Sequence, residues 1–286
     1  MILLKKLFVS SRPISWINTA FPFAVAYFLT TGTIDITLVI GAFFFLIPYN
    51  LLMYGVNDVF DYESDLRNPR KGGIEGALLD PKYHAATLWI SFLFAAPFVI
   101  YLALVGSFES NAWLALVIFS VIAYSIKGLR FKEIPFLDSI TSAMHFVGPM
   151  WFGLSLAGAE VNRTILLVSG TFFLWGMASH AFGAVQDVKA DREAKIGSVA
   201  TVIGARATVY LALAMYLAAG LLALNLEGRF NQAAIAAIPY LIVVGRELSI
   251  TDANCERANR GWKWFIYLNF IAGAIVSALI IGPQPS

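Results

Sequence analysis

The feature that most limits the fold is a series of long apolar segments that recurs along almost the whole chain. Each has about twenty residues, which is roughly what an α-helix needs to cross the hydrocarbon of a bilayer. Apolar residues make up 59% of the chain and charged residues only 13%, an excess that a soluble core does not need. We therefore predict an all-α integral membrane protein. The expected membrane-spanning segments are 13–31, 36–56, 85–106, 110–126, 135–157, 163–184, 206–225, 232–249 and 262–282.

Lysine and arginine are unequally distributed between the segments that connect these nine spans. On one side of the membrane fall 18 of the 20 Lys and Arg residues, and only Arg163 and Arg229 fall on the other. Because positively charged loops are retained in the cytoplasm, we expect the N-terminus and the charged loops to be cytoplasmic. The first ten residues show no cleavage site of a signal peptide. We expect residues 1–286 to form one polytopic membrane domain, with two four-helix units and a ninth helix.

Acidic residues are concentrated where the second predicted span ends. The segment NDVFDYESD, residues 57–65, contains four carboxylates, and Asn57, Asp61 and Asp65 would share one face if the helix continues. Stacked like charges repel one another unless a cation lies between them. The segment DVKAD, residues 187–191, has the same four-residue spacing after the sixth predicted span. Two such motifs at two helix ends predict a site for divalent metal and diphosphate.

Magnesium is the metal that these motifs favour, because it binds one or two carboxylates together with substrate phosphates and water. The single cysteine excludes an intramolecular disulfide, and the three scattered histidines do not resemble a zinc site. Basic side chains near the motifs would neutralise the diphosphate. The candidate diphosphate-binding residues of this kind are Arg67, Arg70, Lys71, Lys127, Arg130, Arg192 and Lys195.

These residues also have simpler interpretations. The carboxylates could be solvated loop charges, and the basic residues could serve only to orient the chain. Asn18 could form a hydrogen bond between helices, Tyr124 could be an interfacial tyrosine, and a structural role is preferred for His145 and His180. A transporter would carry charges at mid-membrane depth, and a CDP-alcohol phosphotransferase would carry a D-G-x-x-A-R signature. The sequence shows neither pattern.

The paired motifs on a nine-helix chain resemble the UbiA superfamily of intramembrane prenyltransferases. The resemblance covers essentially the whole chain, and it implies a UbiA-like bundle that binds Mg²⁺ and an isoprenyl diphosphate. It also implies that Asn18, and Tyr124 and Lys127 in the segment YSIKGLRFK, contact the substrate. Asp61, Asp187 and Asp191 are the implied catalytic residues. The implied metal ligands are Asn57, Asp58, Asp61, Asp65, Asp187 and Asp191.

Within the superfamily, segments such as SRPISWINTAFPFAVAYFLT, GAVQDVKADREA and SVATVIGAR resemble bacterial lycopene elongases. That resemblance implies transfer of five-carbon units from dimethylallyl diphosphate to the ends of lycopene, in a bacterial plasma membrane. The implied partners are an isoprenyl diphosphate, a lipid-soluble acceptor and membrane lipid, without nucleic acid, and a carotenoid cyclase is a candidate partner. RNPRKGG after the first motif replaces the NRPLP-type stretch of the quinone-synthesising branches. An aromatic or quinone-precursor acceptor is the alternative.

Overall fold

The chain is helical along the length that the computed structural model describes, which is residues 2–66 and 78–282. Those residues contain no β-strand, so the predicted all-α fold is confirmed. The chain divides into two compact units. The first consists of Met1–Phe131 and Met144–Glu160, and the second of Lys132–Ala143 and Val161–Ser286.

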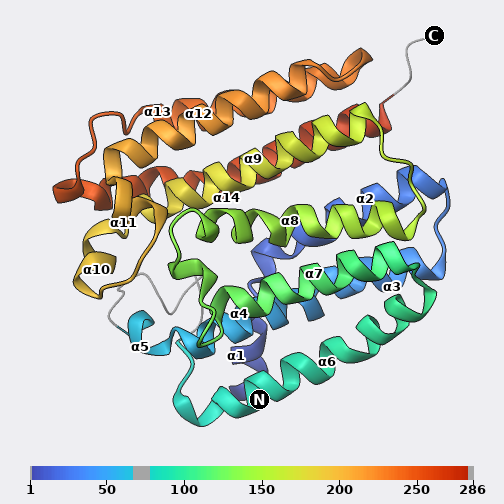
Figure 1. The fold of residues 1–286 in the computed structure, drawn as a ribbon, viewed down its shortest axis with the longest axis horizontal. Coiled ribbons are helices and arrows are strands. Elements are labelled where there is room, and N and C mark those ends of the chain that lie inside the picture. Colours follow the sequence, from blue (N-terminus) through green and yellow to red (C-terminus); the bar gives the residue numbers. More distant parts are fainter. Residues whose placement is uncertain (1, 67–77, 283–286) are drawn as a thin grey trace. The chain divides into compact units, whose positions relative to one another are not determined.

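The first unit contains the helices from α1 to α7 and the second part of α8 (Figure 1). Aromatic rings fill its core: the Phe23 ring lies 5.1 Å from the Phe45 ring and 5.8 Å from the Phe152 ring, centroid to centroid. The helices of this unit are α1 (Ile2–Ser10), η1 (Pro13–Ser15), α2 (Trp16–Thr31), α3 (Ile36–Leu46), α4 (Pro48–Phe60), α5 (Tyr62–Asp65), η2 (Pro81–Tyr83), α6 (His84–Val105), α7 (Phe108–Ser125) and part of α8 (Leu137–Leu156).

The second predicted span is divided into α3 and α4 at Ile47, because Pro48 has no backbone N–H to donate to the preceding turn. Buried side chains bond to the carbonyl oxygens near the break. The Thr19 hydroxyl and the Asn50 side-chain amide both donate to the Phe45 carbonyl, over 2.6 and 2.8 Å. The polar backbone at the break is therefore satisfied inside an apolar unit.

The second unit is built around α9 and α12, which pack along each other (Figure 1). Its core is also aromatic: the Tyr216 and Tyr240 rings stack 5.0 Å apart, and the Phe182 ring lies 5.3 Å from the Phe265 ring. The helices of this unit, besides the start of α8, are α9 (Arg163–Val185), α10 (Val188–Glu193), α11 (Val199–Ile203), α12 (Ala205–Leu224), η4 (Gly228–Ala236), α13 (Ala237–Gly245), η5 (Asp252–Arg257) and α14 (Ala258–Ile281). The short helix η3 (Phe131–Glu133) lies where the chain passes from one unit to the other.

The long helices expose apolar side chains that a soluble protein would bury. On α6, Leu93 is 65% exposed and Leu104 is 80% exposed, which fits contact with lipid. The chain is therefore a membrane protein. In its described part, six helical stretches are long and apolar enough to cross a membrane: Ile36–Phe60, Pro81–Val105, Phe108–Ser125, Arg163–Val185, Ala205–Leu224 and Asp252–Ile281.

The other three predicted spans are also helical, but they are shorter or more polar. Helix α2 has 16 residues and α13 has nine, whereas α8 contains Asp138 and His145 within its 20 residues. The count of nine spans and the cytoplasmic N-terminus stay predictions.

Candidate functional site

The first acidic motif continues a membrane helix rather than following it. Helix α4 extends to Phe60, beyond the predicted end of the second span at residue 56, and Asp61 connects it to α5. The Asp61 N–H donates to the Asn57 carbonyl (2.9 Å), and the Asp65 N–H donates to the Asp61 carbonyl (2.8 Å). This helical hydrogen bonding places Asn57, Asp61 and Asp65 on one face, as their spacing predicts.

Three carboxylates of this motif are buried. Asp58 is 1% exposed, Asp61 8% and Asp65 6%, whereas Glu63 is exposed. A buried carboxylate is costly unless cations or hydrogen-bond donors surround it. The burial therefore argues against the interpretation of these three residues as solvated loop charges.

Arg12 supplies one of the compensating charges. Its Nη2 donates to Asp58 Oδ1 over 3.3 Å, and its guanidinium lies 4.1 Å from the centre of the Tyr54 ring. The pair links the start of the chain to α4 across 46 residues of sequence. This role of Arg12 was not predicted, because a basic residue near the N-terminus is expected from charge distribution alone; nothing in the pattern marked Arg12 as different.

Arg130, which was predicted as a diphosphate-binding residue, lies beside the same motif. Its Nη2 is 3.6 Å from Asp61 Oδ1, and its Nη1 donates to the Phe60 carbonyl over 3.5 Å. Lys127, in the same loop, is exposed. Of the two predicted basic residues in this loop, the structure thus brings Arg130 to the motif and leaves Lys127 at the surface.

Asn57 receives a hydrogen bond from α7: the Ser125 hydroxyl donates to Asn57 Oδ1 over 3.0 Å. Tyr124, which directly precedes Ser125 on α7, is half-buried. The Tyr124 ring contacts the His145 ring edge to face, with the ring centroids 5.1 Å apart. Asn18 is half-buried on α2. The predicted ligands Arg67, Arg70 and Lys71 lie outside the described residues.

The second acidic motif forms the short helix α10. Asp187 precedes the first residue of α10, and the Asp191 N–H donates to the Asp187 carbonyl over 2.8 Å. Both carboxylates are half-buried, and Lys195, which follows α10, is exposed. The predicted four-residue spacing is thus present as one helical turn here too.

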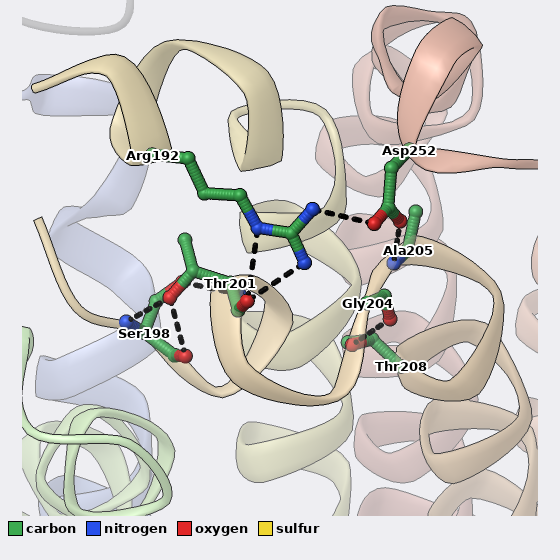
Figure 2. A network of polar contacts seen from close by, with 7 residues as sticks. All are labelled: Arg192, Ser198, Thr201, Gly204, Ala205, Thr208 and Asp252. Carbon is green, nitrogen blue, oxygen red and sulfur yellow. Dashed lines mark hydrogen bonds and ion pairs between the residues drawn. The ribbon is translucent and has the colours of Figure 1, made fainter. Parts of the chain in front are cut away.

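Arg192 is anchored within the second unit, as Figure 2 shows. Its Nε and Nη2 donate to the Thr201 carbonyl over 3.0 and 2.8 Å, and its Nη1 donates to Asp252 Oδ2 over 2.5 Å. The other carboxylate oxygen of Asp252 accepts from the Ala205 N–H at the start of α12 over 2.7 Å. Each nitrogen of this guanidinium therefore bonds to the protein.

Gln186, directly before the motif, is anchored as well. Its Nε2 donates to the Gly183 carbonyl over 2.8 Å, and its Oε1 accepts from Asn259 Nδ2 over 2.6 Å. Cys255 Sγ lies 3.7 Å from the Gln186 carbonyl oxygen, which it can reach as a weak donor. Neither Gln186 nor Asn259 was predicted from the sequence, since polar residues at helix ends are common.

A second polar cluster lies at the start of α8. Asp138 is fully buried, and its Oδ2 accepts from the Val199 N–H over 2.8 Å. Ser139 Oγ lies 3.1 Å from His180 Nδ1. The structural role preferred for His180 agrees with this contact, although the cluster itself was not predicted.

Basic residues account for most of the non-glycine left-handed backbone in the described residues. In the described residues, four non-glycine residues have positive φ, and three of them are basic: Arg12 (49°), Arg130 (41°) and Lys195 (58°). Such conformations cost on the order of 1 kcal/mol or more, and they are concentrated at functional sites. The side chains of Arg12 and Arg130 also reach the first motif.

The available donors suit a hard cation. Asn57, Asp61 and Asp65 provide amide and carboxylate oxygens from one helical face, and Asp187 and Asp191 provide two more carboxylates. In the part of the chain that the structure describes, no three or more Asp, Glu, His or Cys side chains form a metal cage of their own.

Comparison with known proteins gives consistent matches along the chain. The sequence profile of the UbiA prenyltransferase family matches residues 19–273. The chain is 57% identical over 280 residues to the C(50) beta-cyclic carotenoids biosynthesis protein LbtBC of Dietzia sp. strain CQ4. That match covers 98% of this chain and 65% of the Dietzia protein, so the chain spans just under two thirds of that relative's length. It is 50% identical over 278 residues to a lycopene elongase/hydratase of Corynebacterium glutamicum, covering 97% of both proteins.

A solved structure shares the fold. The structure of a UbiA homolog from Archaeoglobus fulgidus bound to DMAPP and Mg2+ aligns with a TM-score of 0.67, over 95% of this chain and 99% of that one. The two sequences are 17% identical, so this likeness concerns the fold alone.

Proposed function

The chain belongs to the UbiA prenyltransferase family and is a membrane-bound prenyltransferase, and we propose that it transfers the five-carbon group of dimethylallyl diphosphate to the ends of lycopene. The acceptor is supported by 50% identity, over nearly the full length of both proteins, to a lycopene elongase/hydratase. The donor is supported by the family and by the DMAPP-bound homolog of the same fold.

The observation that carries this proposal is the buried acidic face of the first motif. Asp61 and Asp65 are less than a tenth exposed and stand one helical turn apart. The Mg²⁺ ions that accompany a prenyl diphosphate would bring positive charge to such a face, which would reduce the repulsion between the carboxylates. We assign Asn57, Asp58, Asp61, Asp65, Asp187 and Asp191 as the residues that would hold Mg²⁺.

The reaction begins when the bond between the allylic carbon and the diphosphate oxygen breaks, and its electron pair leaves with the diphosphate. Magnesium, when bound, neutralises the negative charge that develops on those oxygens. Lys127, Lys195 and the basic residues after the first motif (Arg67, Arg70 and Lys71) would add positive charge around the leaving group. We also keep Asn18, Tyr124 and Arg130 as proposed substrate-binding residues.

The terminal double bond of the acceptor then attacks the allylic cation and forms the new carbon–carbon bond. This leaves a tertiary cation on the former double bond, which either loses a neighbouring proton or is captured by water with release of a proton. We favour capture by water, because the Corynebacterium relative is named an elongase/hydratase. The absence of bulk water in an apolar bundle would protect the allylic cation from quenching before the acceptor attacks it.

The test is expression of the chain in a lycopene-producing host, followed by mass spectrometry of the pigments. We expect carotenoids lengthened by one or two five-carbon units, with hydroxyl groups where water is added. Asp61→Asn should abolish them, and Glu63→Gln, which changes an exposed carboxylate of the same motif, should not.

An unchanged lycopene profile in cells that contain the folded protein would reject lycopene as the acceptor. Membranes would then be assayed with radiolabelled dimethylallyl diphosphate and a panel of aromatic and quinone-precursor acceptors. Transfer to one of these would establish the alternative acceptor class within the same family.

We further propose that the N-terminus and both motifs lie on the cytoplasmic side. The support is the placement of 18 of the 20 Lys and Arg residues on that side of the predicted spans. Alkaline phosphatase fused after residue 195 should be inactive, and the same reporter fused after residue 227 should be active. The reverse pattern would overturn the orientation.

A further inference from the structure

We propose that the segment from Asp252 to Asn259 is a positioning element for the second acidic motif, and that Arg192 positions this motif rather than binding diphosphate. The inference rests on the proposed function, because it assumes that Asp187 and Asp191 hold metal and diphosphate. It adds Asp252, Asn259 and Gln186 to the residues on which that site depends.

Arg192, the residue that follows the motif, is held by contacts with the protein. Arg192 comes directly after Asp191, and its side chain spans from α10 to two anchors, the Thr201 carbonyl and the Asp252 carboxylate (Figure 2). A guanidinium offers five N–H groups in a fixed plane. All three nitrogens of that plane already donate to protein acceptors, so only two of its five N–H groups, one on Nη1 and one on Nη2, remain for other contacts while both anchors hold.

Gln186, the residue that precedes the motif, is also held by contacts with the protein. Gln186 comes directly before Asp187 and is 7% exposed. Its Oε1 accepts from Asn259 Nδ2 over 2.6 Å, while its Nε2 donates to Gly183 at the end of α9. This side chain therefore ties the chain at the entrance of α10 to the first turn of α14.

Both anchors belong to one short segment. Asp252 begins η5, and Asn259 is the second residue of α14. Between them, Cys255 and Ala258 are fully buried in the hydrophobic core of the second unit. The segment is thus fixed to the core and holds the motif at both ends. Asn259 bonds to Gln186, directly before Asp187, and Asp252 pairs with Arg192, directly after Asp191.

This arrangement has a consequence for affinity. Helix α10 has only six residues, too few to be stable without tertiary contacts. Residues that orient metal ligands without touching the metal typically change affinity by 10- to 100-fold when they are removed. We expect loss of either anchor to weaken binding of Mg²⁺ and diphosphate while the rest of the fold is retained.

The experiment measures binding without an acceptor. The full-length protein in detergent is titrated with dimethylallyl thiolodiphosphate, which resists ionisation, in the presence of Mg²⁺. Asp252→Asn keeps an oxygen for the Ala205 N–H but weakens the pair with Arg192. We expect Arg192→Ala, Asp252→Asn and Asn259→Ala each to weaken binding about tenfold, with no change for Arg206→Ala, whose Nε donates to the nearby Ile250 carbonyl.

Two further variants separate positioning from direct contact with the diphosphate. If Arg192 acts through Asp252, the double variant Arg192→Ala/Asp252→Asn should bind no more weakly than either single variant. Arg192→Lys should bind as weakly as Arg192→Ala, because an ammonium keeps the charge but cannot bond to both anchors. Additive losses in the double variant, or wild-type binding by Arg192→Lys, would overturn the inference in favour of direct diphosphate contact.

Thermal unfolding of each variant, without ligand, shows whether the chain is folded. Wild-type affinity in all three single variants would also overturn the inference. If the wild-type protein itself binds no prenyl diphosphate with Mg²⁺, the proposed function fails. If it binds the analogue but does not lengthen lycopene, only the acceptor is wrong, and the test of positioning remains valid.

Discussion

The two acidic motifs share their spacing but differ in how the protein supports them. In the first, buried carboxylates have arginines beside them: Arg12 donates to Asp58, and Arg130 lies 3.6 Å from Asp61. In the second, the carboxylates are half-buried, and the neighbouring residues Gln186 and Arg192 carry the anchoring contacts. The described contacts of Arg12 and Arg130 reach the carboxylates of the first motif, and those of Gln186 and Arg192 hold the flanks of the second.

This difference shows that one sequence pattern can be stabilised by two physical strategies. A buried charge needs nearby opposite charge, because desolvation of a carboxylate costs several kcal/mol or more. A half-buried carboxylate keeps part of its hydration, so its charge is less costly. For the short helix α10, contacts that fix the direction of the helix therefore matter more than further neutralisation of its carboxylates. Substitutions should therefore affect folding more strongly around the first motif and ligand affinity more strongly around the second.

The largest expected effect is common to both motifs. Asp61→Asn and Asp187→Asn should each lower the rate of prenyl transfer about a thousandfold, because each removes a negative charge that would hold a cation at the leaving group. The rates would be measured with radiolabelled dimethylallyl diphosphate in membranes. Glu63→Gln is the matched control, since Glu63 is exposed within the first motif. Full activity in either Asp variant would show that the corresponding motif is not a metal site.

Arg12→Ala sharpens the contrast in folding. It removes the guanidinium beside a fully buried Asp58 carboxylate, so we expect about 3 kcal/mol of destabilisation. The measurement is thermal unfolding of the purified protein in detergent. Lys82→Ala, which breaks the exposed pair with Asp80, should leave the midpoint unchanged. A wild-type midpoint in Arg12→Ala would remove the basis for the contrast.

Gly197→Ala tests the backbone that follows the second motif. A Cβ at Gly197 would overlap the carbonyl oxygen of Glu133, so one of the two loops must move, at a cost of about 2 kcal/mol. Gly245→Ala is the control, because a Cβ there meets nothing within 4 Å. Thermal unfolding should show a lower midpoint for the first variant and an unchanged or slightly higher one for the second. Equal midpoints would show that the loops adjust freely.

The smallest effect concerns one hydrogen bond at the first motif. Ser125→Ala removes the hydroxyl that donates to Asn57 Oδ1. The Mg²⁺ concentration needed for half-maximal activity should therefore rise about fivefold, which corresponds to about 1 kcal/mol. The control is Ser120→Ala on the same helix, whose hydroxyl donates to the Leu116 carbonyl instead. Identical Mg²⁺ titrations for the two variants would argue against Asn57 as a ligand.

Much of the fold follows from local properties of the sequence. Long apolar segments must become helices in a membrane, because every backbone polar group needs a partner within the segment. Their ends are marked by residues such as Asp35 and Asn162, whose side chains cap α3 and α9. The break at Pro48 also has a local cause, the missing backbone N–H of proline. The mixed helix from Gly228 to Gly245 was less predictable, since that stretch packs against α12.

The candidate site was likewise predictable only in part from the sequence. The spacing of Asn57, Asp61 and Asp65 predicts one helical face, and the backbone hydrogen bonds confirm it. The same spacing did not reveal that Arg12 pairs with Asp58, because the two residues are 46 positions apart. Nor did it distinguish Arg192, which is anchored to protein, from Lys195, which is exposed.

By itself, the sequence determined that this chain is helical, lies in a membrane and carries two acidic motifs of prenyltransferase type. Those features depend on composition and on periods of a few residues, which any local stretch of chain expresses. Only the tertiary structure decided which cations meet which carboxylates, and that Asp252 and Asn259 hold the flanks of the second motif. These contacts join residues 46 to 73 positions apart, and such pairings exist only once the helices have packed.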